Sequence, residues 1–243
     1  MKSIVKVALA ATLTLVGFSD VNAQWKSKKV TGNGNVTTKT ISTSDYDGIK
    51  AVGSMDVHLE RGTEGNITVT TDDNLHEYLE IEVEGNTLIL KTKKNFWLKT
   101  RKGVHVTVPF QDISEVALTG SGDIDNKDTI QGDSLELRVT GSGDVDLDVD
   151  VKTLDARVTG SGDMAIRGNS NNLDISVSGS GDFNGSNLVA QNTEALVSGS
   201  GDVRVQAKET LKARVNGSGD IRYSGNPSKS DTKVSGSGSI SSN

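Results

Sequence analysis

The tetrad Gly-Ser-Gly-Asp recurs along this chain with a nearly constant period, and this repeat restricts the fold more than any other feature. Copies begin at Gly120, Gly141, Gly160, Gly179, Gly199 and Gly217, and a last copy at Gly236 ends in Ser239. The successive spacings are 21, 19, 19, 20, 18 and 19 residues. A degenerate copy, Gly53-Ser54-Met55-Asp56, lies far upstream. Self-similarity with a period of this size predicts a solenoid in which each repeat forms one coil.

Alternating apolar and polar residues flank each tetrad. A period of two predicts a strand on either side, and we interpret the two glycines as a bend whose inside leaves no space for a Cβ. Two residues before the first glycine stand Leu118, Val139, Val158, Val177, Val197, Val215 and Val234. Two residues after the second glycine stand Ile124, Val145, Met164, Phe183, Val203, Ile221 and Ile240. Stacked coils would place these apolar residues directly above one another.

The predicted fold is therefore all-β, a parallel β-helix with coils of about 19 residues. Residues 113–243 form the repeat solenoid, and 46–112 form a divergent coil with an insertion that elaborates or caps its N-terminal end. We expect 46–243 to be one continuous domain. A polar leader, 24–45, precedes it, and its first part up to Asn35 is expected to be mobile.

The insertion itself has the pattern of several short strands. Strands are expected at 67–71, 81–84, 88–91 and 104–108, with Gly85-Asn86 as a hairpin turn and Pro109 as the end of the last strand. Residues 72–79 predict one or two helical turns.

The first 23 residues are predicted to be a signal peptide. Lys2 and Lys6 precede a mostly apolar run, and Val21-Asn22-Ala23 has the small residues of a cleavage site. The run is too short for a membrane span, and no lipoprotein cysteine follows it. We expect a soluble protein in the periplasm or outside the cell, cleaved near Ala23, without cysteines or disulfides.

The net charge argues against nucleic acid as a partner. The whole chain carries −6. Because Lys2, Lys6 and Asp20 contribute +1, residues 24–243 carry −7. A chain with a pI near 5.1 and no basic run has no footprint for a phosphate backbone.

Stacking would also align the outward residues of the tetrads, and we expect these columns to be the binding surface. The serine column is Ser121, Ser142, Ser161, Ser180, Ser200 and Ser218, and the aspartate column is Asp123, Asp144, Asp163, Asp182, Asp202 and Asp220. Hydroxyls could hydrogen-bond along the stack. The carboxylates would repel, by about 0.9 kcal/mol between neighbours about 4.8 Å apart even in water.

Three arrangements could relieve this repulsion. Each carboxylate could accept N–H groups of its own glycine turn, or the column could meet a basic partner or a neighbouring subunit. Ca²⁺ could also lie between coils, although the known calcium-binding repeat has a nine-residue period with two copies per coil. No other metal and no cofactor is expected.

An aromatic and basic cluster in the insertion is a second candidate site. Phe96 and Trp97 stand among Lys94, Lys99 and Arg101. The cluster could be a stacking platform for a sugar or an anionic polymer, or the tryptophan could seal the core with a solvated lysine rim.

The tetrads, the Gly53-Ser54-Met55-Asp56 copy, the segment from Asn74 to Leu79 and the strand before Pro109 together resemble the head GIN domain family. The resemblance runs from about residue 46 to the C-terminus. This bacterial family has the label auto-transporter adhesin and no established function. The resemblance implies a right-handed, pectin-lyase-like β-helix, export, a role in adhesion, and no catalytic residues. Since the sequence ends at Asn243, we expect no membrane-barrel translocator.

We therefore predict a non-enzymatic envelope protein that binds a surface polymer such as a glycan, or an envelope protein, and that can form homo-oligomers through its last coil. The alternatives are a lyase-like enzyme acting on polysaccharides and a Ca²⁺-binding structural solenoid. Aspartates that recur alike in every coil do not single out an active site. His58, His76 and His105 lack metal-ligand spacing and a nucleophilic partner, and are interpreted as surface or turn residues.

Overall fold

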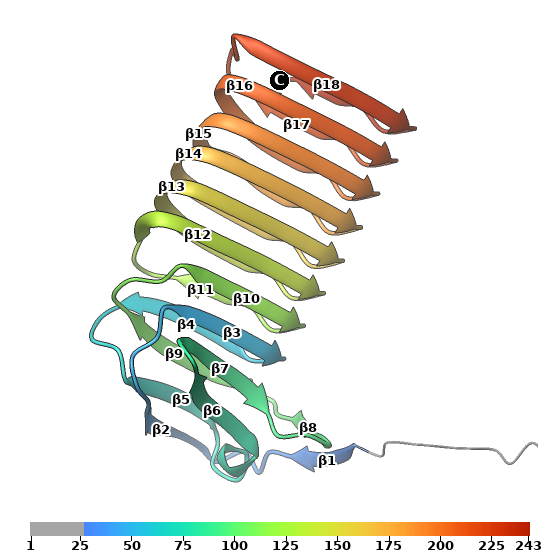
Figure 1. Cartoon of the computed structure of the whole chain (residues 1–243). Coiled ribbons are helices and arrows are strands. Elements are labelled where there is room, and N and C mark those ends of the chain that lie inside the picture. Colours follow the sequence, from blue (N-terminus) through green and yellow to red (C-terminus); the bar gives the residue numbers. More distant parts are fainter. Residues whose placement is uncertain (1–26) are drawn as a thin grey trace, which may run out of the picture.

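The computed structural model describes residues 27–243, which form an all-β solenoid (Figure 1). About seven coils of about 19 residues rise as a right-handed helix, so the predicted fold is confirmed. The predicted signal peptide lies outside the described residues. The N-terminal elements are β1 (Lys28–Thr31), β2 (Val36–Ser42), β3 (Gly48–Gly53), β4 (Asp56–Arg61), β5 (Asn66–Asp72), a 3-10 turn (His76–Tyr78), β6 (Leu79–Glu84), β7 (Thr87–Thr92), β8 (Phe96–Lys99) and β9 (His105–Phe110).

The repeat region contains only parallel strands. They are β10 (Glu115–Gly120), β11 (Ile124–Asn126), β12 (Ile130–Gly141), β13 (Val145–Gly160), β14 (Met164–Gly179), β15 (Phe183–Gly199), β16 (Val203–Gly217), β17 (Ile221–Ser224), β18 (Lys229–Gly236) and β19 (Ile240–Ser242). Their register pairs each first tetrad glycine with the one before it, as Gly141 pairs with Gly120 and Gly160 with Gly141. The predicted columns therefore exist.

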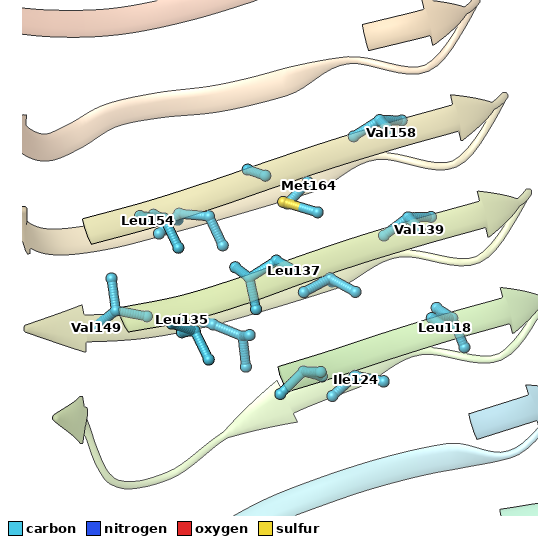
Figure 2. Close-up of a cluster of buried hydrophobic side chains, with 14 of the residues drawn as sticks. Leu118, Ile124, Leu135, Leu137, Val139, Val149, Leu154, Val158 and Met164 are labelled. Atoms are coloured by element: carbon cyan, nitrogen blue, oxygen red, sulfur yellow. The ribbon is translucent and has the colours of Figure 1, made fainter. Parts of the chain in front are cut away.

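Each coil has two arms that face one another across the core. In β13, Val145, Leu147, Val149 and Val151 are buried in alternation. Lys152 and Thr153 then both point outward, and burial resumes with the opposite parity at Leu154. Two consecutive outward residues thus form a second corner opposite the tetrad. The side chains of both arms fill the space between the two sheets (Figure 2).

The order of the first three coils in space differs from their order in the chain. The coil of β3 and β4 pairs with β10 and β11 on one side. On its other side it pairs with β7 and β9, which are also parallel to it. The chain therefore enters the stack at its second coil, forms the terminal coil next, and then returns to begin the repeats.

Antiparallel strands close the N-terminal end. β6 pairs with β7, β5 pairs with β9, and β2 pairs with β5, all antiparallel. We call β2, β5 and β6, together with the loop 62–65 that leads into β5, the cap. The hairpin at Gly85-Asn86 is confirmed, whereas the end of a strand at Pro109 is wrong by one residue. Pro109 lies beyond the part of β9 that β5 pairs, at an edge where a missing N–H is tolerated.

The expectation of a mobile leader is wrong for residues 27–35. β1 pairs with β8, and the turn that follows is held by Asp72, which is 2% exposed. One carboxylate oxygen of Asp72 accepts the N–H of Gly34 at 2.5 Å, and the other accepts the hydroxyl of Thr100 at 2.6 Å. Polar residues that predict mobility are here the partners of a buried carboxylate.

Candidate binding surfaces

The tetrads lie on one edge of the solenoid, which we call the tetrad corner, and their backbones touch from coil to coil. Gly141 has φ +127°, and a Cβ built on it would lie 2.3 Å from the carbonyl oxygen of Gly120. A Cβ on Gly143 would lie 2.0 Å from the oxygen of Gly122. The oxygen of Gly120 in turn accepts the N–H groups of Ser142 and Gly143, at 2.8 and 3.0 Å. Glycine is required because backbone atoms of the preceding coil lie where a Cβ would be. The limiting contact is therefore between coils, and not on the inside of the corner as we expected.

The aspartates are held by the next coil. The Oδ1 atom of each carboxylate accepts the backbone N–H of the aspartate one coil later. The distances are 3.2 Å (Asp144 to Asp123), 2.8 Å (Asp163 to Asp144), 2.8 Å (Asp182 to Asp163), 2.7 Å (Asp202 to Asp182), 2.9 Å (Asp220 to Asp202) and 2.8 Å (Ser239 to Asp220). The expectation that each carboxylate binds its own turn is therefore wrong, although backbone N–H groups are the donors.

The second carboxylate oxygen is free along the middle of the column. For Asp144, Asp163 and Asp182, no hydrogen bond or ion pair within residues 27–243 involves Oδ2. Further along, Arg222 pairs with Oδ2 of both Asp202 and Asp220, at 3.4 and 3.0 Å. No group of three or more His, Cys, Asp or Glu side chains in this part of the chain is arranged to hold a metal ion, so Ca²⁺ at this column remains a prediction.

The serine hydroxyls of the tetrad corner are exposed and have no internal partner. Ser121, Ser142, Ser161, Ser180, Ser200 and Ser218 are all exposed. The predicted hydrogen bonds between them do not form among the described residues. The six Gly-Ser-Gly-Asp tetrads therefore present one hydroxyl and one carboxylate each at intervals of about 4.8 Å. The hydroxyls and the free Oδ2 atoms of Asp144, Asp163 and Asp182 are available to a ligand.

The aromatic and basic cluster lies on the two-stranded ribbon of β1 and β8. Trp97 is 58% exposed, and Nζ of Lys29 lies 5.3 Å from its ring centroid. Phe96 instead packs on Tyr78, with centroids 4.7 Å apart. Lys94, Lys99 and Arg101 are exposed. The interpretation that Trp97 seals the core is therefore wrong, since Leu98 is the residue of β8 that packs against the core.

The second corner carries a polar ladder that the sequence analysis missed. Nδ2 of Asn192 donates to Oδ1 of Asn172 at 3.1 Å, and the hydroxyl of Thr210 donates to Oδ1 of Asn192 at 2.8 Å. A shallow groove of about 440 Å³ runs beside it. On its wall, burial and then the nearby charges of Asp155 and Glu194 raise the pKa of Asp174. The two consecutive outward residues at this corner were the available signal.

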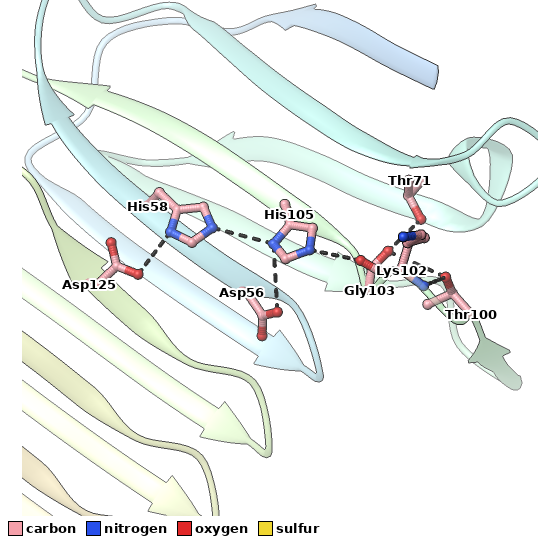
Figure 3. Close-up of polar contacts among 8 residues, drawn as sticks. All are labelled: Asp56, His58, Thr71, Thr100, Lys102, Gly103, His105 and Asp125. Atoms are coloured by element: carbon pink, nitrogen blue, oxygen red, sulfur yellow. Dashed lines mark hydrogen bonds and ion pairs between the residues drawn. The ribbon is translucent and has the colours of Figure 1, made fainter. Parts of the chain in front are cut away.

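The structure brings two of the three histidines together. His58 on β4 and His105 on β9 lie side by side on the outer face (Figure 3). His76 lies apart from them, with Nε2 3.1 Å from the hydroxyl of Thr37, and burial lowers its pKa. Sequence spacing does not show this pair, because it depends on the pairing of β4 with β9.

Known proteins share this architecture. The family described as "Putative auto-transporter adhesin, head GIN domain" matches residues 45–227, while no curated protein matches the chain. A crystal structure of a "putative adhesin" from Bacteroides fragilis is similar with a TM-score of 0.84 and 24% identity, covering 88% of this chain and all of that one. A "putative lipid binding protein" from Parabacteroides distasonis has a TM-score of 0.72 and 29% identity, covering 89% and 100%. A "putative adhesin" from Parabacteroides merdae has a TM-score of 0.73 and 25% identity, covering 88% and 99%.

Helices capable of crossing a membrane are absent from residues 27–243.

Proposed function

The chain belongs to the head GIN domain family, and we propose that it is a non-enzymatic exported protein that binds a surface polymer through the tetrad corner. The proposed ligand is a hydroxyl-rich chain such as a glycan. A repeating ligand suits a repeating surface, because each coil adds one equivalent contact and weak contacts multiply along the stack.

The observation that carries this proposal is the column of exposed serine hydroxyls without internal partners. Each hydroxyl can both donate and accept, and the free aspartate oxygens beside it accept. Such a strip can bind sugar hydroxyls without disturbing the fold, since the backbone contacts and Oδ1 atoms that hold the coils together are separate from it. The recurrence of the same groups in each coil supports binding over catalysis.

A glycan array with the protein lacking its signal peptide tests this proposal. We expect binding to one class of polysaccharide, without release of unsaturated sugars. Replacing Ser161, Ser180 and Ser200 with alanine should weaken binding at least tenfold, because three adjacent contacts are lost. The matched control replaces the exposed serines Ser134, Ser186 and Ser241, away from the tetrad corner. Equal binding by both triple variants, or no polysaccharide ligand, would contradict the proposal.

A second candidate surface is the ribbon of β1 and β8, which we propose as a site for an anionic polymer. The specific observation is the exposed ring of Trp97 beside Lys29 in a chain of net negative charge. Stacking and cation attraction would act together. Binding here should fall with salt and with Trp97→Ala, whereas binding at the tetrad corner should not change with Trp97→Ala.

Homo-oligomers through the last coil are also part of the proposal. All residues of β18 are exposed, including Val234 at 41%, and β18 pairs on one side only, with β16, among the described strands. An open parallel edge can pair with another copy. Sedimentation equilibrium should show association that Val234→Lys abolishes, and a monomer at all concentrations would contradict it.

Export to the periplasm or cell surface is the last part of the proposed function. It is supported by the leader pattern and by membership of an adhesin family. Mass spectrometry of the protein recovered from cell fractions should give a chain that begins at Gln24. A full-length chain in the cytoplasm would contradict it.

A further inference from the structure

Two histidines on adjacent parallel strands direct ring nitrogens at each other. Nε2 of His58 and Nδ1 of His105 are 3.4 Å apart, and the two rings are nearly parallel, with an interplanar angle of 14° and centroids 5.6 Å apart. Both side chains are accessible, at 41% and 42% exposure. Figure 3 shows the two rings side by side, with Asp56 next to His105.

The outer nitrogens fix where each ring carries its proton. Nδ1 of His58 lies 2.8 Å from the carboxylate of Asp125, and Nε2 of His105 lies 2.8 Å from the carbonyl oxygen of Lys102. Carbonyl and ionised carboxylate oxygens only accept hydrogen bonds. Both outer nitrogens must therefore carry hydrogen, and in the neutral rings both inner nitrogens hold lone pairs.

Two facing lone pairs repel unless a cation lies between them. Nitrogens bound to one tetrahedral metal ion at 2.0–2.1 Å are about 3.4 Å apart, which is the separation observed here. Oδ2 of Asp56 lies 3.7 Å from Nδ1 of His105, so a carboxylate is in reach of the same point through a bridging water. The remaining positions face solvent.

One partner of the outer nitrogens, the carbonyl of Lys102, is itself held in place. The loop that carries the carbonyl of Lys102 is fixed by two threonines. The hydroxyl of the buried Thr71 donates to the oxygen of Gly103 at 3.0 Å, and that of Thr100 accepts the N–H of Lys102 at 3.1 Å. Histidines that ligate metals almost always donate their other N–H to a carboxylate or backbone carbonyl, and both do so here.

We propose that His58 and His105 form a binding site for a first-row divalent cation such as Zn²⁺, supported by Asp56 and oriented by Asp125 and the carbonyl of Lys102. The site uses two imidazole nitrogens, which suit such ions better than Ca²⁺ or Mg²⁺. It bridges β4 and β9, the strands by which the second coil rests on the terminal one. It is separate from the serine column, so its failure would leave the proposed adhesion function standing.

Calorimetric titration of ZnCl₂ into protein without a histidine tag tests the site. We expect one Zn²⁺ per chain, with affinity at least tenfold weaker in His58→Gln and in His105→Gln. Asp125→Asn should weaken binding 10- to 100-fold through the orientation of His58. His76→Gln and Asp150→Asn, which changes an exposed aspartate outside the tetrad corner, are the controls, and binding should stay within twofold of the wild type. Circular dichroism melting checks that the variants fold.

A long-range ¹H–¹⁵N spectrum of the histidine rings provides a second measurement. Without metal it should show hydrogen on Nδ1 of His58 and Nε2 of His105, and Zn²⁺ should shift the two inner nitrogens. Absence of Zn²⁺ binding, binding that persists in both histidine variants, or a proton shared between the inner nitrogens at neutral pH that Zn²⁺ does not displace would each overturn the proposal.

Discussion

The repeat coils and the N-terminal cap solve the same problem, joining strands into a stack, by different means. In the repeats, glycines bring backbones into direct contact, and one aspartate per coil binds the next N–H. In the cap, each buried carboxylate accepts a set of hydrogen bonds that is not repeated elsewhere in the described residues. Glu64, 8% exposed, accepts the N–H of Tyr46 at 2.8 Å and that of Gln111 at 3.0 Å.

The two regions differ in how much stability is lost when a single residue is changed. A uniform stack shares its polar contacts among many equivalent groups, so one side chain matters little while one backbone position matters a great deal. In the cap the losses are concentrated, because removing one carboxylate leaves two donors without their partner. Substitutions in the two regions should therefore rank in a definite order.

The largest effect should come from adding one methyl group to a tetrad glycine. The Cβ in Gly162→Ala would lie 2.1 Å from the oxygen of Gly143, a backbone atom that cannot rotate away. We expect a loss of about 3 kcal/mol or more in the free energy of unfolding, measured by urea denaturation. The control is Gly132→Ala, where the Cβ would meet nothing within 4 Å, and a change below about 0.5 kcal/mol is expected. Similar losses in both would break the comparison.

Removing the cap carboxylate should rank second. Glu64→Ala leaves two backbone donors unpaired and should cost about 2–3 kcal/mol. Hydrogen exchange should accelerate at the amides of Tyr46 and Gln111, and much less at Val177 in the repeats. Glu209→Ala, an exposed glutamate in the repeats, should change stability by less than about 0.5 kcal/mol. Uniform acceleration along the chain would mean that cap and repeats open as one unit.

Removing one aspartate of the column should have a smaller effect. Asp163→Ala loses the acceptor for the N–H of Asp182 at a partly accessible position, which should cost about 1 kcal/mol. Asp163→Asn keeps an acceptor oxygen and removes one repelling charge, so thermal denaturation should show a change below about 0.5 kcal/mol. If Asp163→Ala lowered the free energy of unfolding as much as Glu64→Ala does, the idea that the repeats share their polar contacts among equivalent groups would be contradicted.

The smallest effect concerns the charge of Asp174. Burial, and then Asp155 and Glu194, raise the pKa of this carboxyl in the folded state. Folding then takes up a proton, so the contribution is most favourable at low pH and is lost as the pH rises through the folded pKa. Asp174→Asn should melt slightly above the wild type at pH 7, and the difference should vanish as the pH falls below the ordinary range of aspartate. A constant difference across this range would exclude the charge as its cause.

The repeats could be predicted from the sequence. The strand pairing of the cap, the turn held by Asp72 and the pair of His58 and His105 could not. Nearly constant spacing and period two fix the register of Val139 on Leu118, because only one alignment superposes every tetrad. The turn held by Asp72 and the facing rings of His58 and His105 depend on strands that meet only after the chain reverses its order in the stack. No local pattern encodes those contacts. The exposure of Trp97 likewise depends on Leu98 taking the inward position.

Because the tetrad coils share one backbone register at the tetrad corner, a further coil can be added within the stack. A duplicate of residues 164–182, inserted after Asp182, would meet its native neighbour, the coil that begins at Phe183, on one side and a copy of itself on the other. Each duplication would lengthen the rod by about 4.8 Å and add one rung to the polar strip. The length of the solenoid, and with it the length of the polar strip, can therefore change by whole coils while the two terminal coils stay the same.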